Sequence, residues 1–187
     1  MDVSKYMDLN PAARVVFNSL PERRSRVRFM IPDGQGDWRA ITWGAFANEI
    51  EAVGLYLNSI GVKLGDRATI LAHNCVEWMS AALGIQAMGG VMVPIYPSST
   101  AEQIAYVIDH SDARVLFVDS EKLLRRVLEQ WEQVEGGLLR IIALNDELDV
   151  AKSLEALRAD GVVAPSASKV AEKFATWSQV RAQGRAL

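Results

Sequence analysis

Two residues of this sequence, His73 and Cys75, have the types and the spacing of a base and a nucleophile. An imidazole beside a thiol could withdraw its proton and leave a reactive thiolate. Both residues also stand between a predicted strand and a predicted helix, where a cysteine commonly packs and stays inert. The structural interpretation is therefore favoured. The one cysteine and two histidines do not give the three or four closely spaced ligands of an ordinary zinc site, because His110 is far along the chain from His73 and Cys75.

A second segment with chemical potential is residues 96–100, which follow a predicted strand and open a predicted helix. The free N–H groups of a helix N-terminus, with hydroxyls nearby, can hold an anion or a polar ligand group. Ser98 and Ser99 could instead only cap the helix, and Asn74 heads a second capping box with Glu77. The candidate cofactor-binding residues are Asn74, Tyr96, Ser98 and Ser99, and no catalytic or metal-binding residue is predicted.

Three common functional motifs are missing from the sequence. Gly34 and Gly36 lack the third glycine of a dinucleotide fingerprint. Residues 84–89 have the glycine spacing of a Walker loop but continue Gly90-Val91, without the lysine that meets a phosphate. No G-x-S-x-G elbow occurs.

The elements that would position these residues alternate along the chain. Short apolar runs predict strands at residues 68–72, 91–95, 114–118 and 139–144. Helical periodicity predicts helices at 42–60, 76–88, 100–109, 123–134, around 153–158 and 177–183, with a loop through Gly161 and Pro165.

This alternation predicts an α/β fold, a mostly parallel sheet with helices on both faces. In such sheets ligands bind beyond the carboxyl ends of the strands. Those ends are residues 73–74, 96–99, 119–120 and 145–146.

Residues 1–187 are expected to form a single α/β subdomain, in which residues 1–25 are a peripheral helix and loop. Runs at 27–31 and 38–42 flank turn-forming residues and predict a small β-hairpin near the N-terminus.

Composition excludes several classes of function. The net charge of −3 and the lack of a basic cluster with interleaved aromatic residues argue against a nucleic-acid partner. No apolar run approaches the roughly 18 residues of a transmembrane helix, and residues 1–10 do not resemble a signal peptide. A single cysteine suits a reducing compartment, so we expect a cytoplasmic protein, with peripheral membrane association left open.

Three segments resemble the N-terminal part of the adenylate-forming, AMP-binding superfamily, and specifically the AMP-forming long-chain fatty-acyl-CoA synthetases. They are WRAITWGAF (38–46), GVKLGDRA with NCVEW (61–68 and 74–78), and GGVMVPIYPSSTAEQI with HSDARV (89–104 and 110–115). The family often has threonine where Ser98 stands, which keeps the hydroxyl. Residues 176–179 (TWSQ) resemble the stretch that precedes the family's ATP-binding loop.

The resemblance implies a parent enzyme that uses ATP, Mg²⁺ and coenzyme A. A fatty acid carboxylate attacks the α-phosphate of ATP, which gives an acyl-adenylate and pyrophosphate, and the thiol of coenzyme A then displaces AMP. The family's ATP-binding loop and catalytic lysine do not occur among these 187 residues. We therefore expect an inactive N-terminal portion whose partner is the remainder of the synthetase domain.

Two alternatives stay open: a stand-alone doubly wound module that binds or interacts without catalysis, and an unrelated doubly wound binding protein. Whether these residues alone are an enzyme is also left open. An N-terminal portion should expose an apolar face, so a homo-oligomer is expected.

Overall fold

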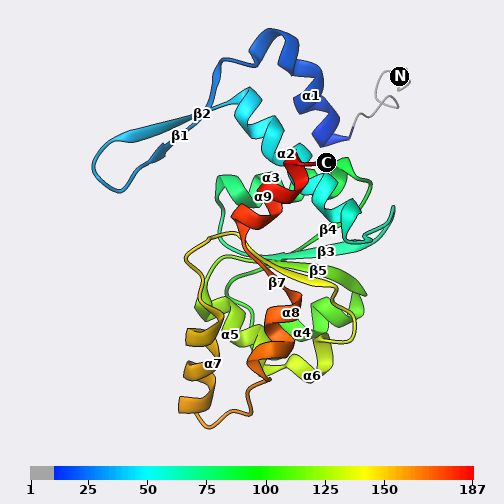
Figure 1. Cartoon of the computed structure of the whole chain (residues 1–187), viewed down its shortest axis with the longest axis vertical. Helices are drawn as coiled ribbons and strands as arrows, with labels where there is room; N and C mark the ends of the chain where they lie inside the picture. Colours follow the sequence, from blue (N-terminus) through cyan, green and yellow to red (C-terminus); the bar gives the residue numbers. More distant parts are fainter. Residues whose placement is uncertain (1–10) are drawn as a thin grey trace, which may run out of the picture.

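A five-stranded parallel sheet forms the middle layer of the computed structural model, which describes residues 11–187 (Figure 1). The strand order is β4-β3-β5-β6-β7. The strands are β3 (Arg67–Leu71), β4 (Val91–Ile95), β5 (Ala113–Val118), β6 (Arg140–Ala143) and β7 (Phe174–Ala175). The predicted α/β class and all four predicted strands are confirmed.

Helices cover both faces of this sheet (Figure 1). One face carries α2 (Trp43–Ser59), α3 (Val76–Ala87) and α9 (Trp177–Arg185). The other carries α4 (Ala101–His110), α5 (Glu121–Glu129), α6 (Trp131–Val134), α7 (Val150–Ala159) and α8 (Ala167–Lys173). In β5, Val115 and Phe117 face the first layer while Leu116 and Val118 face the second, so successive residues enter opposite cores.

The N-terminal segment lies outside these layers, above α2 and α3 in Figure 1. The helix α1 (Ala12–Arg23) is followed by the antiparallel hairpin of β1 (Val27–Pro32) and β2 (Trp38–Thr42). Asp33 closes the hairpin turn by accepting hydrogen bonds from the N–H groups of Gln35 and Asp37, which also lower its pKa. The predicted hairpin is confirmed. The predicted peripheral segment is helical from Ala12, and its residues 1–10 lie outside the described residues.

Three details of the sequence prediction are wrong. The helix expected at 123–134 breaks at Gln130, whose φ of −114° and ψ of 30° are not helical; α6 then turns so that Trp131 and Val134 still bury. The predicted loop through Gly161 and Pro165 is present, but no helix or strand was predicted directly after it, where α8 and β7 form. The N-cap of α3 is Cys75, whose Sγ accepts from the Trp78 N–H at 3.3 Å, so Asn74 does not head a capping box.

Other helix ends agree with the sequence. Thr42 caps α2, and complete capping boxes pair Thr100 with Gln103 and Thr176 with Gln179. Among residues 11–187, no helix combines the length and apolar character required to cross a bilayer.

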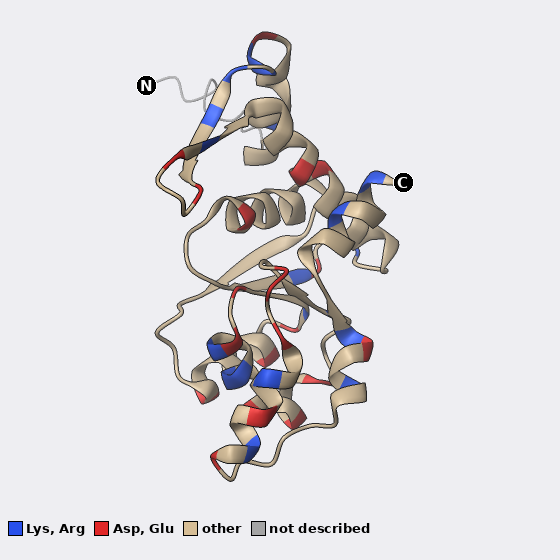
Figure 2. Cartoon of the chain, turned by 60° about the vertical axis from the view of Figure 1, so that its left-hand side comes forward, with Lys and Arg blue, Asp and Glu red and all other residues tan. Residues whose placement is uncertain are grey.

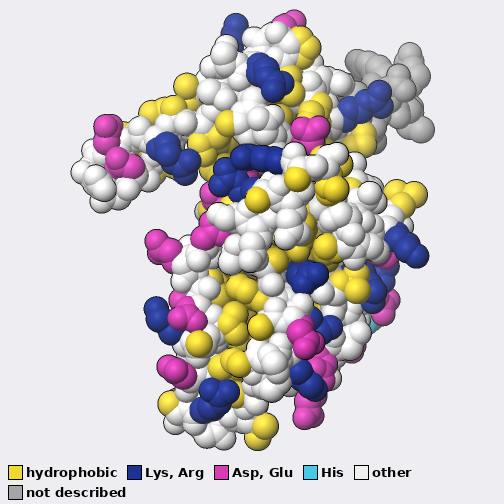
Figure 3. All heavy atoms as spheres, viewed as in Figure 1, with side chains coloured by type: hydrophobic (Ala, Val, Ile, Leu, Met, Phe, Trp, Pro, Cys, Tyr) yellow, Lys and Arg dark blue, Asp and Glu magenta, His cyan; other side chains and the backbone are white. Residues whose placement is uncertain are grey.

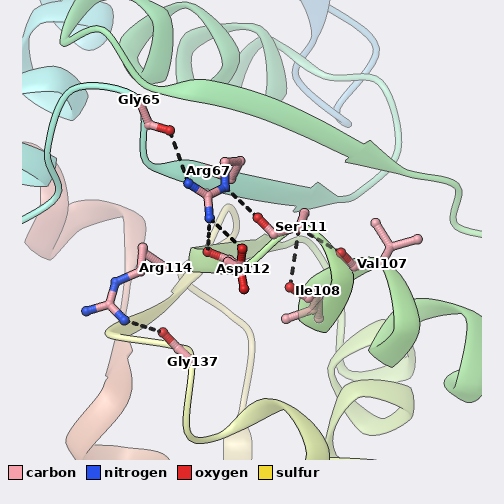
Figure 4. Close-up of polar contacts among 8 residues, drawn as sticks. All are labelled: Gly65, Arg67, Val107, Ile108, Ser111, Asp112, Arg114 and Gly137. Carbon is pink, nitrogen blue, oxygen red and sulfur yellow. Dashed lines mark hydrogen bonds and ion pairs between the residues drawn. The ribbon is translucent and has the colours of Figure 1, made fainter.

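Arg67 ties the amino end of β3 to the turn between α4 and β5 (Figure 4). Its Nε donates to the Ser111 carbonyl at 2.5 Å, and its Nη2 pairs with Asp112 at 3.0 Å. Asp112 adopts a left-handed φ of 47°, which this contact helps to hold. Close by, Arg114 donates to the Gly137 carbonyl. These bonds fix the amino edge of the sheet and leave the carboxyl edge to other residues.

The helices α2 and α3 approach closely because Gly84 has no side chain. A Cβ at Gly84 would lie 2.5 Å from Val53 Cγ1 and 3.0 Å from the Ile50 carbonyl oxygen, distances that a real side chain does not tolerate. Both neighbours belong to fully buried residues of α2. The helical pair therefore depends on this glycine.

We predict that Gly84→Ala lowers the free energy of unfolding by about 1–3 kcal/mol through overpacking. An exposed Gly→Ala change inside a helix would ordinarily stabilise by about 1 kcal/mol, so the expected sign is reversed. Urea denaturation measures the change. Gly136→Ala is the control because a Cβ there would meet nothing within 4 Å. A Gly84→Ala variant as stable as the parent chain would contradict the packing.

Candidate functional site

The strand order defines where a ligand site can lie. The chain goes from β3 outward to β4 and then returns past β3 to build β5, β6 and β7 on the other side. The connections on the two sides of this switch diverge and leave a crevice beyond the carboxyl ends of β3 and β5. His73 follows β3 there, and Asp119 follows β5.

A double contact joins His73 and Asp119 across the switch point. Asp119 Oδ2 accepts from the backbone N–H of His73 at 2.6 Å and lies 2.8 Å from its Nδ1. The Asp119 side chain is 16% exposed and that of His73 is 71% exposed. The carboxylate therefore positions the loop after β3 and presents the imidazole to solvent. Its other oxygen, Oδ1, is buried and accepts no hydrogen bond from residues 11–187.

A hollow of about 630 Å³ opens beside this pair, and we name it the strand-end cleft. Its wall is built from the ends of three neighbouring strands and the first turns of α3 and α9. The lining residues are His73, Cys75, Glu77, Asp119, Ser120, Leu144, Asn145, Asp146, Glu147, Trp177 and Arg181. Four of them are carboxylates and one is an arginine, so the cleft is acidic. Figure 2 shows acidic segments in red on the loops between the two helical layers.

Asp146 fixes the start of α9 to the end of β6. Its Oδ1 accepts from the Ser178 N–H at 2.8 Å, and its Oδ2 accepts from the Ser178 hydroxyl. Partial burial disfavours the carboxylate, but the hydrogen bonds from Ser178 and Thr176 outweigh it and lower the pKa of Asp146. The interaction closes one wall of the strand-end cleft.

Cys75 lies in the cleft wall without the properties of a nucleophile. Burial of its thiol, in a residue that is otherwise exposed, raises the pKa of Cys75 to about 11. The thiol therefore stays protonated near pH 7. The ring nitrogen Nδ1 of His73 is already engaged by Asp119. These contacts agree with the structural interpretation of the His73 and Cys75 pair.

The loop that follows β4 forms a separate hollow of about 580 Å³, lined by Tyr96, Ser98, Ser99, Glu102, Gln103, Tyr106 and Val107. Arg126 of α5 shapes this loop by donating from Nη1 to the carbonyls of Pro97 at 2.7 Å and Ser99 at 2.9 Å. Tyr96 is 81% exposed. The sequence analysis missed Arg126 because an arginine on an amphipathic helix usually indicates a solvated face.

The predicted strand ends are brought together only in part. Those at 73–74, 119–120 and 145–146 each contribute to the strand-end cleft, whereas 96–99 line the separate hollow. Asn74 is exposed and lines neither. A third hollow of about 710 Å³ lies between α6 and residues 162–169, toward the opposite end of the sheet, because α5 runs back from the carboxyl edge.

These residues do not by themselves fit a magnesium nucleotide. Within the described part of the chain, no group of three or more His, Cys, Asp or Glu side chains could hold a metal ion. The carboxylates of the strand-end cleft would also repel phosphate groups. No chemical step through Mg²⁺ or ATP follows from this site.

The protein is therefore of the open α/β class. Its cleft lies at the point where the strand order reverses, which is where ligands bind in sheets of this class. The family model described as AMP-binding enzyme matches residues 16–176, and the chain belongs to this family.

Among curated relatives, the long-chain-fatty-acid–CoA ligase FadD15 of Mycobacterium bovis is 40% identical over 118 residues. That match covers 63% of this chain and 18% of the relative's length. The long-chain-fatty-acid–CoA ligase heimdall of Drosophila melanogaster is 32% identical over 94 residues, which cover 50% of this chain and 14% of the relative.

Among solved structures, the A domain of a carboxylic acid reductase from Segniliparus rugosus, in complex with AMP and a co-purified carboxylic acid, superposes with a TM-score of 0.69. It shares 14% identity and covers 94% of this chain and 30% of that one. The anthranilate CoA ligase AuaEII gives a TM-score of 0.67 at 24% identity and covers 76% of this chain and 26% of that one. These similarities support the fold.

We predict that Asp146→Asn destabilises the chain at pH 7 by about 0.5–1 kcal/mol, because it weakens charge-assisted hydrogen bonds at a largely solvated site. The pKa of Asp146 is lowered in the folded state from its usual 3.8. The carboxylate therefore stabilises fully above that value, and the contribution is lost as pH falls through the folded pKa. The difference between parent and variant should shrink toward acid in urea denaturation at several pH values.

Glu147→Gln is the matched control. Glu147 lines the same cleft, but its carboxylate accepts no hydrogen bond within the described residues. A stability difference for Asp146→Asn that is unchanged between pH 7 and pH 3 would contradict the role of the ionised carboxylate.

Proposed function

We propose that this chain is the N-terminal portion of a long-chain fatty acid–CoA ligase. The parent reaction would convert ATP, a fatty acid and coenzyme A into acyl-CoA, AMP and pyrophosphate through an acyl-adenylate. The single observation that carries the proposal is the 40% identity, over 118 residues, to a mycobacterial long-chain-fatty-acid–CoA ligase. The family match over residues 16–176 supports the same assignment.

In this proposal the 187 residues supply scaffold and not chemistry. The acidic cleft and the protonated thiol of Cys75 are unsuited to nucleotide phosphates and to nucleophilic attack. The phosphate-binding and catalytic groups of the ligase would belong to the remainder of the synthetase domain. The reaction would take place in the cytoplasm, with peripheral association to a membrane as the open alternative.

The candidate cofactor-binding residues of the proposed ligase remain Asn74, Tyr96, Ser98 and Ser99. The exposed ring of Tyr96 and the two serines share one hollow, which offers a flat apolar face beside hydroxyl groups. That combination suits a polar group of ATP or coenzyme A. Asn74 does not line this hollow. It belongs to the proposal because the last residues of the parallel strands β3 and β4, Leu71 and Ile95, are paired, so the loops after both strands lie on the same edge of the sheet.

The first test is pyrophosphate release from ATP, Mg²⁺ and a long-chain fatty acid such as palmitate. We expect no release above the rate without protein from the 187-residue chain, because it lacks groups that would stabilise the transferred phosphates. The mycobacterial relative is the positive control. Release that requires both the fatty acid and this chain would contradict the proposed inactivity.

A non-catalytic interaction module on the same fold is the second candidate, and an apolar surface favours it. Val91 of the edge strand β4 is 49% exposed and Leu64, which lies over Gly89, is 85% exposed. Tyr96 and Tyr106, which line the hollow of the β4 loop, are 81% and 59% exposed. We name these four residues the β4 surface. It would pack against the remainder of the synthetase domain, or against a second copy of this chain.

We predict that the isolated chain self-associates through the β4 surface. Light scattering should give a mass that rises with concentration, and Val91→Lys should reduce the rise because a charge on an edge strand blocks pairing. The matched control is Val163→Lys, at an 89% exposed residue in the connection between α7 and α8. A monomeric mass at every concentration would contradict self-association.

A further inference from the structure

The hairpin of β1 and β2 projects from the body of the protein, and its two faces have different surroundings (Figure 1). On the inner face, Phe29 and Ile41 are paired across the ribbon and pack against the buried cluster that α1 and α2 supply. The ring of Phe29 lies 5.1 Å from the ring of Phe46. Because successive strand residues point to opposite sides, the residues between these form the outer face.

The outer face of the hairpin is apolar although it is exposed. Its cross-strand pairs are Met30 with Ala40 and Pro32 with Trp38, and we name these four residues the hairpin face. All four are exposed, Met30 to 52% and Trp38 to 58%. The solvated face of an antiparallel ribbon ordinarily carries polar side chains. The hairpin face therefore has the composition of a contact surface.

The segment that carries the hairpin is basic, in contrast to the rest of the chain. Residues 11–43 contain six arginines and three carboxylates, which gives a net charge of +3 in a chain whose total is −3. The arginines are all exposed, and they are Arg14, Arg23, Arg24, Arg26, Arg28 and Arg39. None of the six makes an ion pair with any residue from 11 to 187, whereas Arg67, Arg125 and Arg181 of the body pair with carboxylates. The positive charge of this segment is therefore uncompensated.

Two of these arginines lie over an aromatic ring at the base of the hairpin. The guanidinium carbon of Arg28 is 4.4 Å from the centroid of the Trp43 ring, and that of Arg23 is 5.5 Å from it. A cation held over a ring keeps its charge and its N–H donors for a partner. Figure 3 shows hydrophobic and basic side chains next to one another on the hairpin, with acidic side chains at its tip.

Uncompensated guanidinium groups beside an exposed apolar face fit the surface of an anionic lipid bilayer. Arginine donates to the phosphate and carboxylate oxygens of headgroups, and the indole of Trp38 suits the boundary between headgroups and acyl chains. A nucleic acid fits less well, because Met30, Pro32 and Ala40 offer no ring on which a base could stack.

The geometry of the ribbon limits how deeply it could enter a bilayer. Its two strands have open edges, whose backbone groups would lose water in hydrocarbon without gaining partners. Asp33 and Asp37 at the turn accept hydrogen bonds from backbone N–H groups and disfavour entry by the tip. The ribbon would therefore lie flat, with the hairpin face at the level of the headgroups.

We propose that the hairpin face and the arginines around it dock this chain on the surface of an anionic phospholipid bilayer. Such binding strengthens with the apolar area that is buried and with the attraction to anionic lipids, and residues 11–43 supply both. A membrane surface is only an open alternative in the proposed function, and the hairpin gives it a binding site. Docking requires no ATP, fatty acid or coenzyme A, so it can fail while the ligase assignment stands.

Sedimentation of the chain with lipid vesicles tests the docking, with phosphatidylcholine alone and with phosphatidylcholine mixed with phosphatidylserine. We expect binding to the mixed vesicles in about 0.1 M NaCl and its loss in about 1 M NaCl, because the Debye length falls from about 10 Å to about 3 Å. Arg24→Gln combined with Arg26→Gln should lower the partition coefficient about 25-fold, since each arginine near the surface contributes about fivefold. Met30→Ser combined with Trp38→Ser should lower it about tenfold through lost apolar contact.

Arg158→Gln and Val163→Ser are the matched controls, because both residues are exposed and lie on α7 and after it, far from the hairpin (Figure 1). Both should bind vesicles as the parent chain does, and urea denaturation verifies that every variant is folded. Docking is overturned if the chain binds neither kind of vesicle or binds both equally. It is also overturned if Met30→Ser with Trp38→Ser leaves the partition coefficient unchanged, because charge alone, as for a nucleic acid, would then account for binding.

Discussion

The need to bury a parallel sheet on both faces determines the rest of this structure. Strands β3, β5 and β6 are almost completely buried, so neither face can be left to solvent. The first layer is completed by α9, which returns from the last strand to pack on α2 and bring Trp177 and Val180 into the core. The closeness of these helices requires glycine at their contacts, as at Gly84 and Gly184.

The two edges of the sheet serve different purposes because of this arrangement. Arg67 and Arg114 bond to backbone carbonyls at the amino edge and make it rigid. The carboxyl edge carries the strand switch and the acidic strand-end cleft.

Much of this could be predicted from sequence because the central strands are continuous apolar runs and the helices have clear ends. Thr100 and Thr176 head capping boxes that are plain in the sequence. The strands at 114–118 and 139–144 have the composition of buried elements. The short strand β7 and the helix α8 were missed, because two residues of strand and one buried residue, Val170, leave no periodic pattern.

The candidate site was less predictable, since its contacts join residues far apart in the chain. No local pattern links His73 to Asp119, Asp146 to Ser178, or Arg126 to the loop after β4. Local pattern placed the start of α3 correctly at Val76 but assigned the wrong cap, because a cysteine thiol caps the helix in place of the better capping residue Asn74.

Native-state hydrogen exchange of the backbone amides tests the two-faced sheet most directly. The structure predicts the strongest protection in β3, β5 and β6, weaker protection in β7 and in the edge strand β4, and the least in the projecting hairpin. Amides of β3 that exchange as fast as those of the hairpin would contradict it, because a strand buried on both faces can exchange only when a whole helical layer opens.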